Sequence, residues 1–335
     1  MRLLALKDLI GQDIAVNQLK KAAEKKSPAP SYLFYGPQGT GRRTAAVAFS
    51  AALNCRGSGA DACLNCGSCA KIRRGVHPDL LVVEPARDTI KLAQVREIGE
   101  FTSTPALEGT FKVVIIDPAD GLTVEAQNYL LKLLEEPKGN EVFILITSRA
   151  GAVLSTVISR CQIIKFQLLK DEVVADLLVQ EGYGSEEARW ASRLARGSVD
   201  LAKGFLSPEV REQRERVLGM MEKLSQADLA LATSLAARLA GEKDDFRSMW
   251  RWVAYWYRDK VVWTETQREE LVFNLDKLNS LSGGKVDSRI MNPICQALKR
   301  ERYHANKELL WTVLLLQLSG FGEESWLADG NWGTV

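Results

Sequence analysis

Five short apolar segments recur through the first half of the chain, each followed by a polar or amphipathic stretch. They lie between residues 31 and 166 and read "SYLFYG", "DLLVVEP", "FKVVIIDP", "EVFILITS" and "CQIIKF". Each segment is apolar throughout, without alternation, which is typical of parallel strands that helices cover on both faces. Residues 1–165 are therefore predicted to form a doubly wound, parallel α/β domain.

The strand signals stop after Phe166, and the rest of the chain has a helical pattern. Residues 166–205 hold two short amphipathic segments separated by glycines, which predict a small helical lid. Residues 206–335 contain longer segments, such as "PEVREQRERVLGMMEKL" and "NKELLWTVLLLQL", which predict an all-helical C-terminal domain.

A tryptophan-rich run, "WRWVAYWYRDKVVW", lies in this helical region. Such a run can act as a stacking platform for single-stranded nucleic acid. However, Trp252, Tyr255, Trp256 and Trp263 recur at helical spacing, which favours burial of one helix face in a bundle or a subunit interface.

Charge and composition narrow the class of protein. The chain has 335 residues with 44 Lys or Arg and 42 Asp or Glu, a formal net charge of +2, so any contact with nucleic acid must be local. Its longest apolar run, near residues 309–318, is shorter than the roughly 20 residues that span a bilayer. The N-terminus lacks the apolar core of a signal peptide, which predicts a cytoplasmic protein with reduced thiols.

Four cysteines fall within a module of fifteen residues, 55–69. Cys55, Cys63, Cys66 and Cys69 include two overlapping C-x-x-C steps, and four thiolates form a closed tetrahedral shell for Zn²⁺. The spacing predicts a structural zinc site. An interaction knob is the preferred role of this module, and a DNA-binding finger remains open although no reading helix follows.

The stretch "GPQGTGRRT" resembles a phosphate-binding loop with two altered residues. Gly36, Gly39 and Gly41 keep the frame that lets backbone N–H groups wrap a phosphate. Arg42 stands where the loop carries lysine, and Arg43 stands where a hydroxyl helps to hold Mg²⁺.

A second part of a nucleotide site follows about 75 residues later. The apolar segment "KVVIID" ends in Asp117, the position of the acid that supports Mg²⁺ in such folds. The next position normally carries the carboxylate that orients the attacking water, and here it is Pro118. The losses at Arg42, Arg43 and Pro118 fall on the groups that handle metal and water. We therefore predict that the site keeps the fold of a nucleotide-binding site but does not hydrolyse ATP.

Several motifs in their order along the chain resemble one family. "GPQGTGRRTAA", the cysteine module, "IKLAQVREI", "KVVIIDPADGL", "AQNYLLKLLEEP", "ILITS" and "STVISRCQ" are similar to the clamp-loader AAA+ ATPases of bacterial DNA polymerase III. The resemblance covers roughly residues 6–205. It implies an AAA+ domain, a helical lid and a C-terminal helical collar, which here fits only by helix content and position.

The resemblance also implies roles for particular residues. Arg160, in the Ser-Arg-Cys motif, would be an arginine finger that enters the ATP site of a neighbouring subunit. Thr147 takes the first sensor position, whereas Asp200 stands where a second sensor arginine would contact the γ-phosphate. Arg96 would be a contact to the DNA backbone, and a solvated helix face remains the alternative.

The sequence therefore predicts a non-hydrolysing stator subunit of a clamp loader that presents Arg160 in trans. The implied partners are the ATPase subunits (gamma/tau), the delta subunit, the sliding clamp and primer–template DNA, and the implied cofactor is structural Zn²⁺. Two alternatives stay open. One is an ATP-hydrolysing motor subunit that tolerates Arg42, and the other is a zinc-dependent DNA-processing accessory protein.

Overall fold

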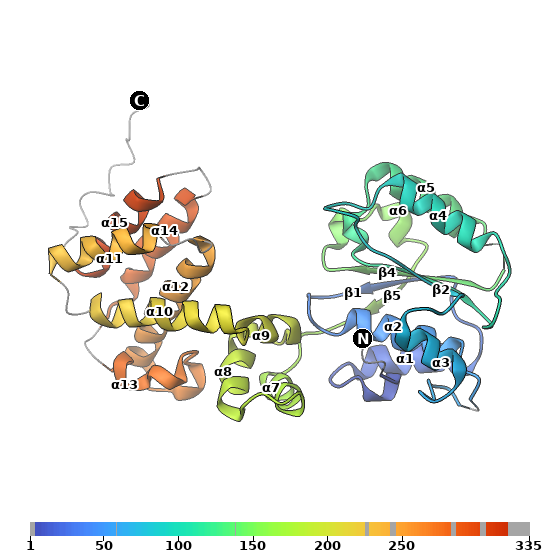
Figure 1. The fold of residues 1–335 in the computed structure, drawn as a ribbon, viewed down its shortest axis with the longest axis horizontal. Coiled ribbons are helices and arrows are strands. Elements are labelled where there is room, and N and C mark those ends of the chain that lie inside the picture. The colour runs from blue at the N-terminus through green and yellow to red at the C-terminus, as the bar shows by residue number, and fades with distance from the viewer. Residues whose placement is uncertain are drawn as a thin grey trace. The chain divides into compact units, whose positions relative to one another are not determined.

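The five apolar segments form the strands of one parallel sheet in the computed structural model of the protein (Figure 1). The order across the sheet is β2-β3-β4-β1-β5, and every pairing is parallel. The strands are β1 (Ser31–Tyr35), β2 (Leu80–Val83), β3 (Lys112–Ile116), β4 (Glu141–Thr147) and β5 (Gln162–Lys165). The predicted parallel α/β fold is confirmed.

The structure describes residues 4–57, 59–137, 139–224, 228–241, 246–282, 286–301 and 306–320. The chain divides into two units, Met1–Lys203 with the sheet and the helical Gly204–Val335. The boundaries drawn at 165 and 205 for a lid and a collar stay predictions.

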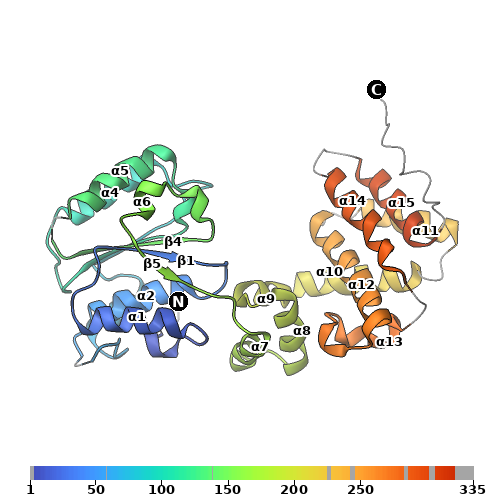
Figure 2. The same cartoon turned by 180° about the vertical axis from the view of Figure 1, so that it is seen from behind.

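Helices cover both faces of the sheet in the first unit, as Figures 1 and 2 show from opposite sides. The helices on the sheet are α1 (Asp13–Glu24), α2 (Arg42–Leu53), α3 (Gly67–Arg74), α4 (Leu92–Thr102), α5 (Val124–Glu135) and α6 (Ser155–Ile158). Three further helices follow the sheet in the chain, α7 (Asp171–Gln180), α8 (Ser185–Ala195) and α9 (Val199–Phe205). Two separate apolar clusters result, because α1 to α3 pack on one face and α4 to α6 on the other. The central strands β3, β4 and β1 are therefore buried on both sides, whereas the edge strand β5 exposes most of its side chains.

The second unit consists of helices joined by short segments. Its α-helices are α10 (Pro208–Leu224), α11 (Leu229–Gly241), α12 (Phe246–Thr266), α13 (Leu278–Leu281), α14 (Met291–Glu301) and α15 (Lys307–Leu318). Single turns of 3₁₀-helix occur in both units at Leu6–Asp8, Ala119–Gly121, Ala150–Ala152, Glu269–Leu271, Leu275–Lys277 and Ser288–Ile290.

The tryptophan-rich run forms the middle of α12 and lies in the core of this unit. Trp250, Trp252 and Trp256 are each at most 1% exposed, and the ring of Trp250 packs 5.0 Å from that of Trp311 on α15. The prediction of a buried helix face is confirmed for Trp252 and Trp256, whereas Tyr255 and Trp263 are only half-buried. The three buried rings are not available to stack on bases.

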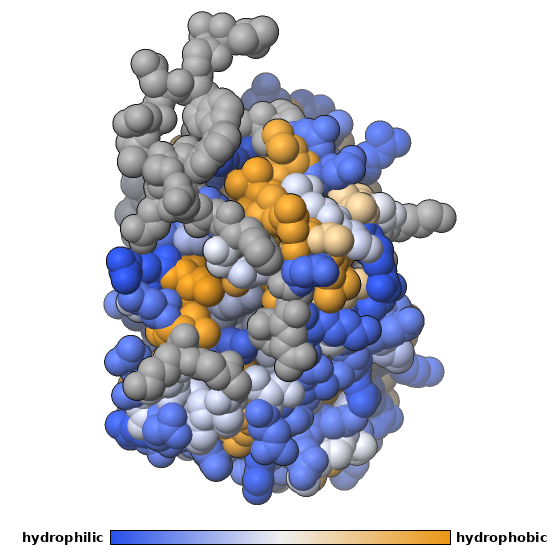
Figure 3. Space-filling model, turned by 90° about the vertical axis from the view of Figure 1, so that its left-hand side faces the viewer, coloured by the Kyte–Doolittle hydropathy of each residue, from blue (hydrophilic) through white to orange (hydrophobic). Residues whose placement is uncertain are grey.

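Apolar side chains also reach the surface of the second unit. Leu229 and Leu231 on α11, and Leu309 and Val313 on α15, are all more than a third exposed. Figure 3 shows apolar surface on this side of the unit. Exposed apolar groups of this kind are suited to contact with another protein.

A buried carboxylate ties α12 to the segment that follows it. Asp259 is fully buried, and its carboxylate accepts hydrogen bonds from the N–H of Phe273 (3.1 Å) and from the N–H and Nδ2 of Asn274 (both 2.7 Å). Arg214 on α10 donates to Oδ1 of Asn274 at 2.8 Å, which extends the network to a third segment. Such a network stabilises only while every member keeps its partners.

We expect Asp259→Ala to lower the free energy of unfolding by about 3 kcal/mol, because the N–H groups and Arg258 lose a buried acceptor. The measurement is urea denaturation of the full chain followed by tryptophan fluorescence, which reports on the buried rings of α12. Asp287→Ala, at an exposed carboxylate of the same unit, is the control and should leave the midpoint unchanged. Equal midpoints for both variants would show that the network does not stabilise the unit.

Candidate functional site

The candidate nucleotide site lies at the carboxyl edge of the sheet. Strands β3, β4 and β1 are neighbours there, so Asp117, Thr147 and the loop that follows Tyr35 meet at one edge. The loop leaves β1 through Gly36, whose N–H donates to the Thr147 carbonyl at 3.3 Å. A Cβ at Gly36 would lie 2.4 Å from the Phe166 carbonyl oxygen, so the close approach of the chain requires glycine.

The glycine frame of the loop has the conformation expected of a phosphate loop. Gly39 and Gly41 have φ values of 74° and 87°, and Gly41 precedes α2 as its N-cap. Backbone N–H groups in such a turn, followed by a helix N-terminus, form a concave site for an anion. These residues line a cavity of about 610 Å³ together with Arg42, Arg43, Asp117 and Thr147.

Arg43 lies beside Asp117, the acid that the sequence analysis predicts to support a metal. Its Nη1 pairs with the carboxylate of Glu84 and lies 3.5 Å from Oδ2 of Asp117. The hydrogen bond to Glu84 raises the pKa of Arg43, so this guanidinium stays charged. Burial raises the pKa of Asp117, although Arg43 and Arg42 favour its charged form. A charged guanidinium therefore lies next to the carboxylate of Asp117.

The predicted sensor residue also has an internal partner. The hydroxyl of Thr147 donates to Oδ1 of Asp120 at 2.8 Å, and Nε of Arg149 donates to Oδ2 of Asp120 at 2.9 Å. Burial opposes ionisation of Asp120, but these two hydrogen bonds outweigh it and lower the pKa of its carboxyl. The hydroxyl that would report on a γ-phosphate is thus already engaged.

The sequence interpretation missed Asp120, Arg149 and Glu84. The first two follow predicted strands by a few residues, a position that could have marked them as candidates. Glu84, just past β2, comes close to Arg43 only because β2 and β3 pair.

The segment at the start of α9 packs directly on the phosphate loop. The N–H of Val199 donates to the Gly39 carbonyl at 2.9 Å, and a Cβ at Gly39 would lie 2.0 Å from Oγ of Ser198. Asp200 faces the same cavity as Arg42 and interacts with its guanidinium. The sensor arginine that the family resemblance implies at this position is thus replaced by an acid.

Arg160 lies outside this cavity, just after α6. Its Nη2 pairs with Oε1 of Glu135 at 2.5 Å, and its Nη1 donates to the Thr156 carbonyl at 2.9 Å. Oγ of Ser31 donates to the Arg160 carbonyl at 2.6 Å and so fixes the backbone. The side chain remains 38% exposed, so the guanidinium is held at the surface by neighbours on its own chain.

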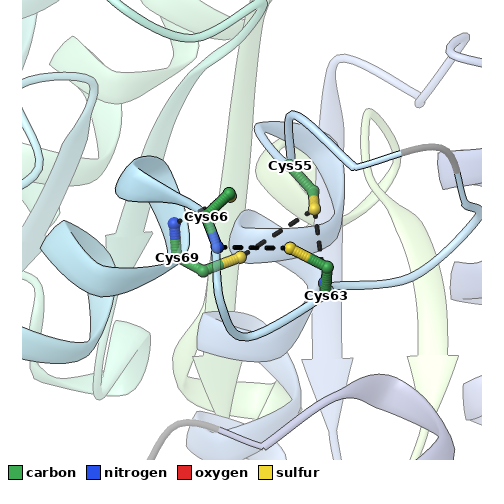
Figure 4. Close-up of side chains that lie close together, drawn as sticks. All are labelled: Cys55, Cys63, Cys66 and Cys69. Atoms are coloured by element: carbon green, nitrogen blue, oxygen red, sulfur yellow. Dashed lines mark hydrogen bonds between the residues drawn. The ribbon is translucent and has the colours of Figure 1, made fainter.

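The four cysteines of the module converge at one point (Figure 4). Cys55 follows α2, Cys63 lies in the loop, Cys66 is the N-cap of α3 and Cys69 lies in its first turn. The four sulfur atoms lie within 4.8 Å of one another, and those of Cys55 and Cys69 are 3.9 Å apart. Sulfur ligands of a tetrahedral Zn²⁺ at about 2.3 Å are about 3.8 Å apart, so the arrangement is suited to a metal ion.

Backbone N–H groups stabilise a thiolate in this cluster. Burial opposes ionisation of Cys66, but hydrogen bonds from the N–H groups of Cys69 and Arg56 and from the neighbouring thiols outweigh it and lower its pKa to about 6. Burial raises the pKa of Cys69. A thiolate at Cys66 near neutral pH suits a metal ligand, because the thiolate is the form that binds.

The module is anchored to the rest of the first unit. The carboxylate of Asp61 accepts hydrogen bonds from the N–H of Leu6 (2.8 Å) and Lys7 (2.9 Å). Buried Ser68 on α3 forms a hydrogen bond with Nε2 of His77 at 3.0 Å. His77 is therefore a structural partner of the module, consistent with a shell of four cysteines.

Arg96 lies on the exposed face of α4, where Glu97 and Glu100 are exposed as well. Its role as a DNA contact stays a prediction.

Known proteins are similar to this chain over part of its length. Residues 11–170 match the family described as DNA polymerase III, delta subunit. The DNA polymerase III subunit delta′ of Bacillus subtilis is 35% identical over 208 residues, which cover 62% of this chain and 63% of that protein. Over these residues the chain is similar to the delta prime subunits of the DNA polymerase III clamp loader. The delta′ subunit of Pseudomonas aeruginosa is similar, with 37% identity over 209 residues, 60% of this chain and 63% of its own length.

The clamp-loader resemblance of the motifs is thus confirmed, over less than two thirds of the length of these delta prime relatives. A crystal structure of a DNA polymerase III gamma subunit-related protein from Thermotoga maritima covers 91% of this chain and 98% of its own, with 20% identity and a TM-score of 0.44. None of the helices in the described ranges combines the length and hydropathy needed to cross a bilayer.

Proposed function

We propose that this chain is the non-hydrolysing delta prime subunit of the DNA polymerase III clamp loader and acts in DNA replication. The observation that carries the proposal is the position of Arg43, paired with Glu84 and Asp117 at the place of the metal. Hydrolysis of ATP needs a metal to neutralise developing charge on the phosphates and a group to orient water. The charge of Arg43 opposes binding of the metal, and Pro118 has no group that could orient the water.

The chain acts instead on the ATP site of its neighbour. Arg160 stabilises charge on the phosphoryl group transferred there, as an arginine finger does. Support comes from its exposed guanidinium, its absence from the cavity of its own chain and its position in the Ser-Arg-Cys motif. On assembly the neighbour's phosphate replaces the surface pair with Glu135, which is worth little in water.

The partners of the subunit are the ATPase subunits, the delta subunit and the sliding clamp. The apolar side chains exposed on α11 and α15 are suited to packing in a helical collar. The zinc module serves as an interaction knob, because Ser68 anchors its α3 while Arg56, Cys63 and Asn65 of the module are exposed to partners. Arg96 contacts the DNA backbone rather than bases, so its contribution is independent of sequence.

Reconstitution tests this function directly. The isolated chain is expected to show no Mg²⁺-dependent ATPase above the level without protein, because its metal position is held by Arg43. Mixed with ATPase and delta subunits, a sliding clamp and primed DNA, the chain should be required for clamp loading and for clamp-stimulated ATP hydrolysis. The measurements are phosphate release and the amount of clamp retained on DNA.

Two results would contradict the proposal, and each favours a different alternative. Steady turnover by the isolated chain that disappears with Asp117→Asn would indicate a motor subunit. Failure to copurify with the other subunits, with clamp loading unchanged in its absence, would indicate an accessory protein outside the clamp loader.

A further inference from the structure

Three segments that are far apart in the sequence meet beside the cysteine module. They are the residues that follow α2, the end of α3, and the loop that joins α4 to β3. The carboxylate of Glu108 in this loop pairs with Lys71 on α3, and the Glu108 carbonyl accepts a hydrogen bond from Arg56 at 3.3 Å. Residues 71–76 and 107–108, together with Arg56, therefore form one surface, which we call the Glu108 surface.

Buried polar side chains hold the loop of this surface in place. The carboxylate of Asp79, which is fully buried, accepts hydrogen bonds from the N–H groups of residues 107–109 at 2.7 to 2.8 Å. Oδ1 of buried Asn54 accepts two more, from residues 110 and 111, both at 2.9 Å. A partner that binds here loses little free energy in ordering the loop, because its backbone is already fixed.

Two apolar side chains project from the Glu108 surface. Leu107 is 75% exposed, and Val76 is 61% exposed. They lie on the two segments that the pair of Lys71 with Glu108 joins, and the N–H of Val76 donates to the Lys71 carbonyl at 3.0 Å. Apolar groups held out on a fixed backbone gain free energy when a partner covers them.

Positive charge surrounds these apolar side chains. Arg73 and Arg74 are exposed in the last turn of α3, and no acid in the described ranges lies within ion-pair distance of either. Glu108 is the acid of this surface, and it lies within 4.0 Å of both Lys71 and Arg56. The surface therefore carries an excess of positive charge, which attracts an acidic partner.

The combination of apolar and basic groups favours a protein over a nucleic acid. An interface between proteins has an apolar centre and a polar rim in which arginine is enriched. Single-stranded nucleic acid instead requires aromatic side chains on which bases stack, and the residues of the Glu108 surface include no aromatic ring.

From these observations we propose that the Glu108 surface is the docking site of an acidic protein segment that carries an apolar side chain. The apolar side chain packs on Leu107 and Val76, and the carboxylates of the segment pair with Arg73 and Arg74. The inference rests on the proposed function in one respect, namely that the zinc module serves as an interaction knob, and it gives that knob a class of partner.

Fluorescence anisotropy of a labelled peptide, titrated with the full chain purified without chelator, tests the central claim. The peptide has one central leucine between two runs of aspartate. We expect saturable binding that weakens about tenfold when the leucine is replaced by glycine, and at least as much when the aspartates are replaced by asparagine. No saturable binding, or equal affinities for the three peptides, would overturn the inference.

A labelled oligothymidylate decides between the two classes of partner. It should bind more weakly than the leucine peptide, because it has no apolar side chain for Leu107. Tighter binding of the oligothymidylate, lost when Arg73 and Arg74 are both replaced by serine, would overturn the proposal and assign the surface to nucleic acid.

Variants assign the two parts of the contact. Leu107→Ser should weaken binding of the leucine peptide about tenfold and leave binding of the glycine peptide unchanged. Arg73→Ser combined with Arg74→Ser should weaken binding of both peptides. Val124→Ser on α5 and Arg189→Ser on α8 remove exposed groups of the same kinds elsewhere and should bind as the unchanged chain does.

The zinc content of each variant shows whether the module is still folded. If the arginine variant loses its zinc, Leu107→Ser still decides the proposal, because Leu107 lies outside the module. Equal affinity of Leu107→Ser for the two aspartate peptides is expected, whereas an unchanged preference for leucine would overturn the docking site.

The outcomes separate this inference from the proposed function, since the peptide experiment contains no other clamp-loader subunit. Absence of peptide binding, with clamp loading by the reconstituted complex intact, would overturn the docking site and leave the subunit role. Peptide binding that responds to the variants as expected supports the docking site even if clamp loading does not require the chain, a result that would contradict the proposed function alone.

Discussion

Replacing Arg160 with alanine is expected to lower ATP turnover at the neighbouring site of an assembled clamp loader by about a thousandfold, the scale of an arginine finger acting in trans. The chain should still fold and assemble, because the change removes a partly exposed guanidinium whose pair with Glu135 lies at the surface. The measurement is a pre-steady-state burst of phosphate release, which should lose the amplitude of one site while the others keep theirs.

Two controls make this test specific. Arg160→Lys should restore little turnover, because an ammonium does not reproduce the planar pair of donors. Arg189→Ala removes an arginine from an exposed helix face and should leave the burst unchanged. A complex with Arg160→Ala that hydrolyses ATP and loads clamps at the unmodified rate would leave only a scaffolding role for this subunit.

Replacing Cys66 with serine is expected to reduce bound zinc from one ion per chain to a small fraction of that value. The residue is both a ligand and the N-cap of α3, so its loss opens the shell and weakens the start of the helix. Because structural zinc contributes folding energy directly, residues 55–74 should also become accessible to hydrogen exchange. Metal analysis and exchange mass spectrometry measure the two effects.

Cys295→Ser is the matched control, because Cys295 is exposed on α14 and lies outside the cluster. It should leave zinc content and exchange unchanged. Full-length protein that carries no metal, with all four thiols of the cluster open to alkylation under native conditions, would contradict the zinc assignment.

Features that depend on neighbours in sequence could be predicted from the sequence. The cysteine cluster is one example, since Cys55 to Cys69 are joined by a short loop and one turn of helix, and their spacing alone brings four sulfur atoms together. The buried face of α12 is another example, because tryptophans at helical spacing predict that one side of the helix is buried.

The parallel sheet was also predictable, since uniformly apolar strands are stable only when helices cover both faces. Its strand order places the phosphate loop, Asp117 and Thr147 at one edge. The loop was recognised from its glycines, Asp117 from its place at the end of a strand, and Thr147 from the family resemblance. The altered residues Arg42, Arg43 and Pro118 could likewise be read by position within the motif.

What the altered residues do was decided only by the tertiary structure. Arg43 meets Glu84 because β2 pairs with β3. Arg160, just after α6, meets Glu135 at the end of α5 because these two helices are in contact. Thr147 meets Asp120 through the adjacency of β3 and β4. Ion pairs and hydrogen bonds act over a few ångströms, whereas these partners are 25 to 41 residues apart along the chain. Local pattern determines which elements form, and the packing of those elements determines which charges meet.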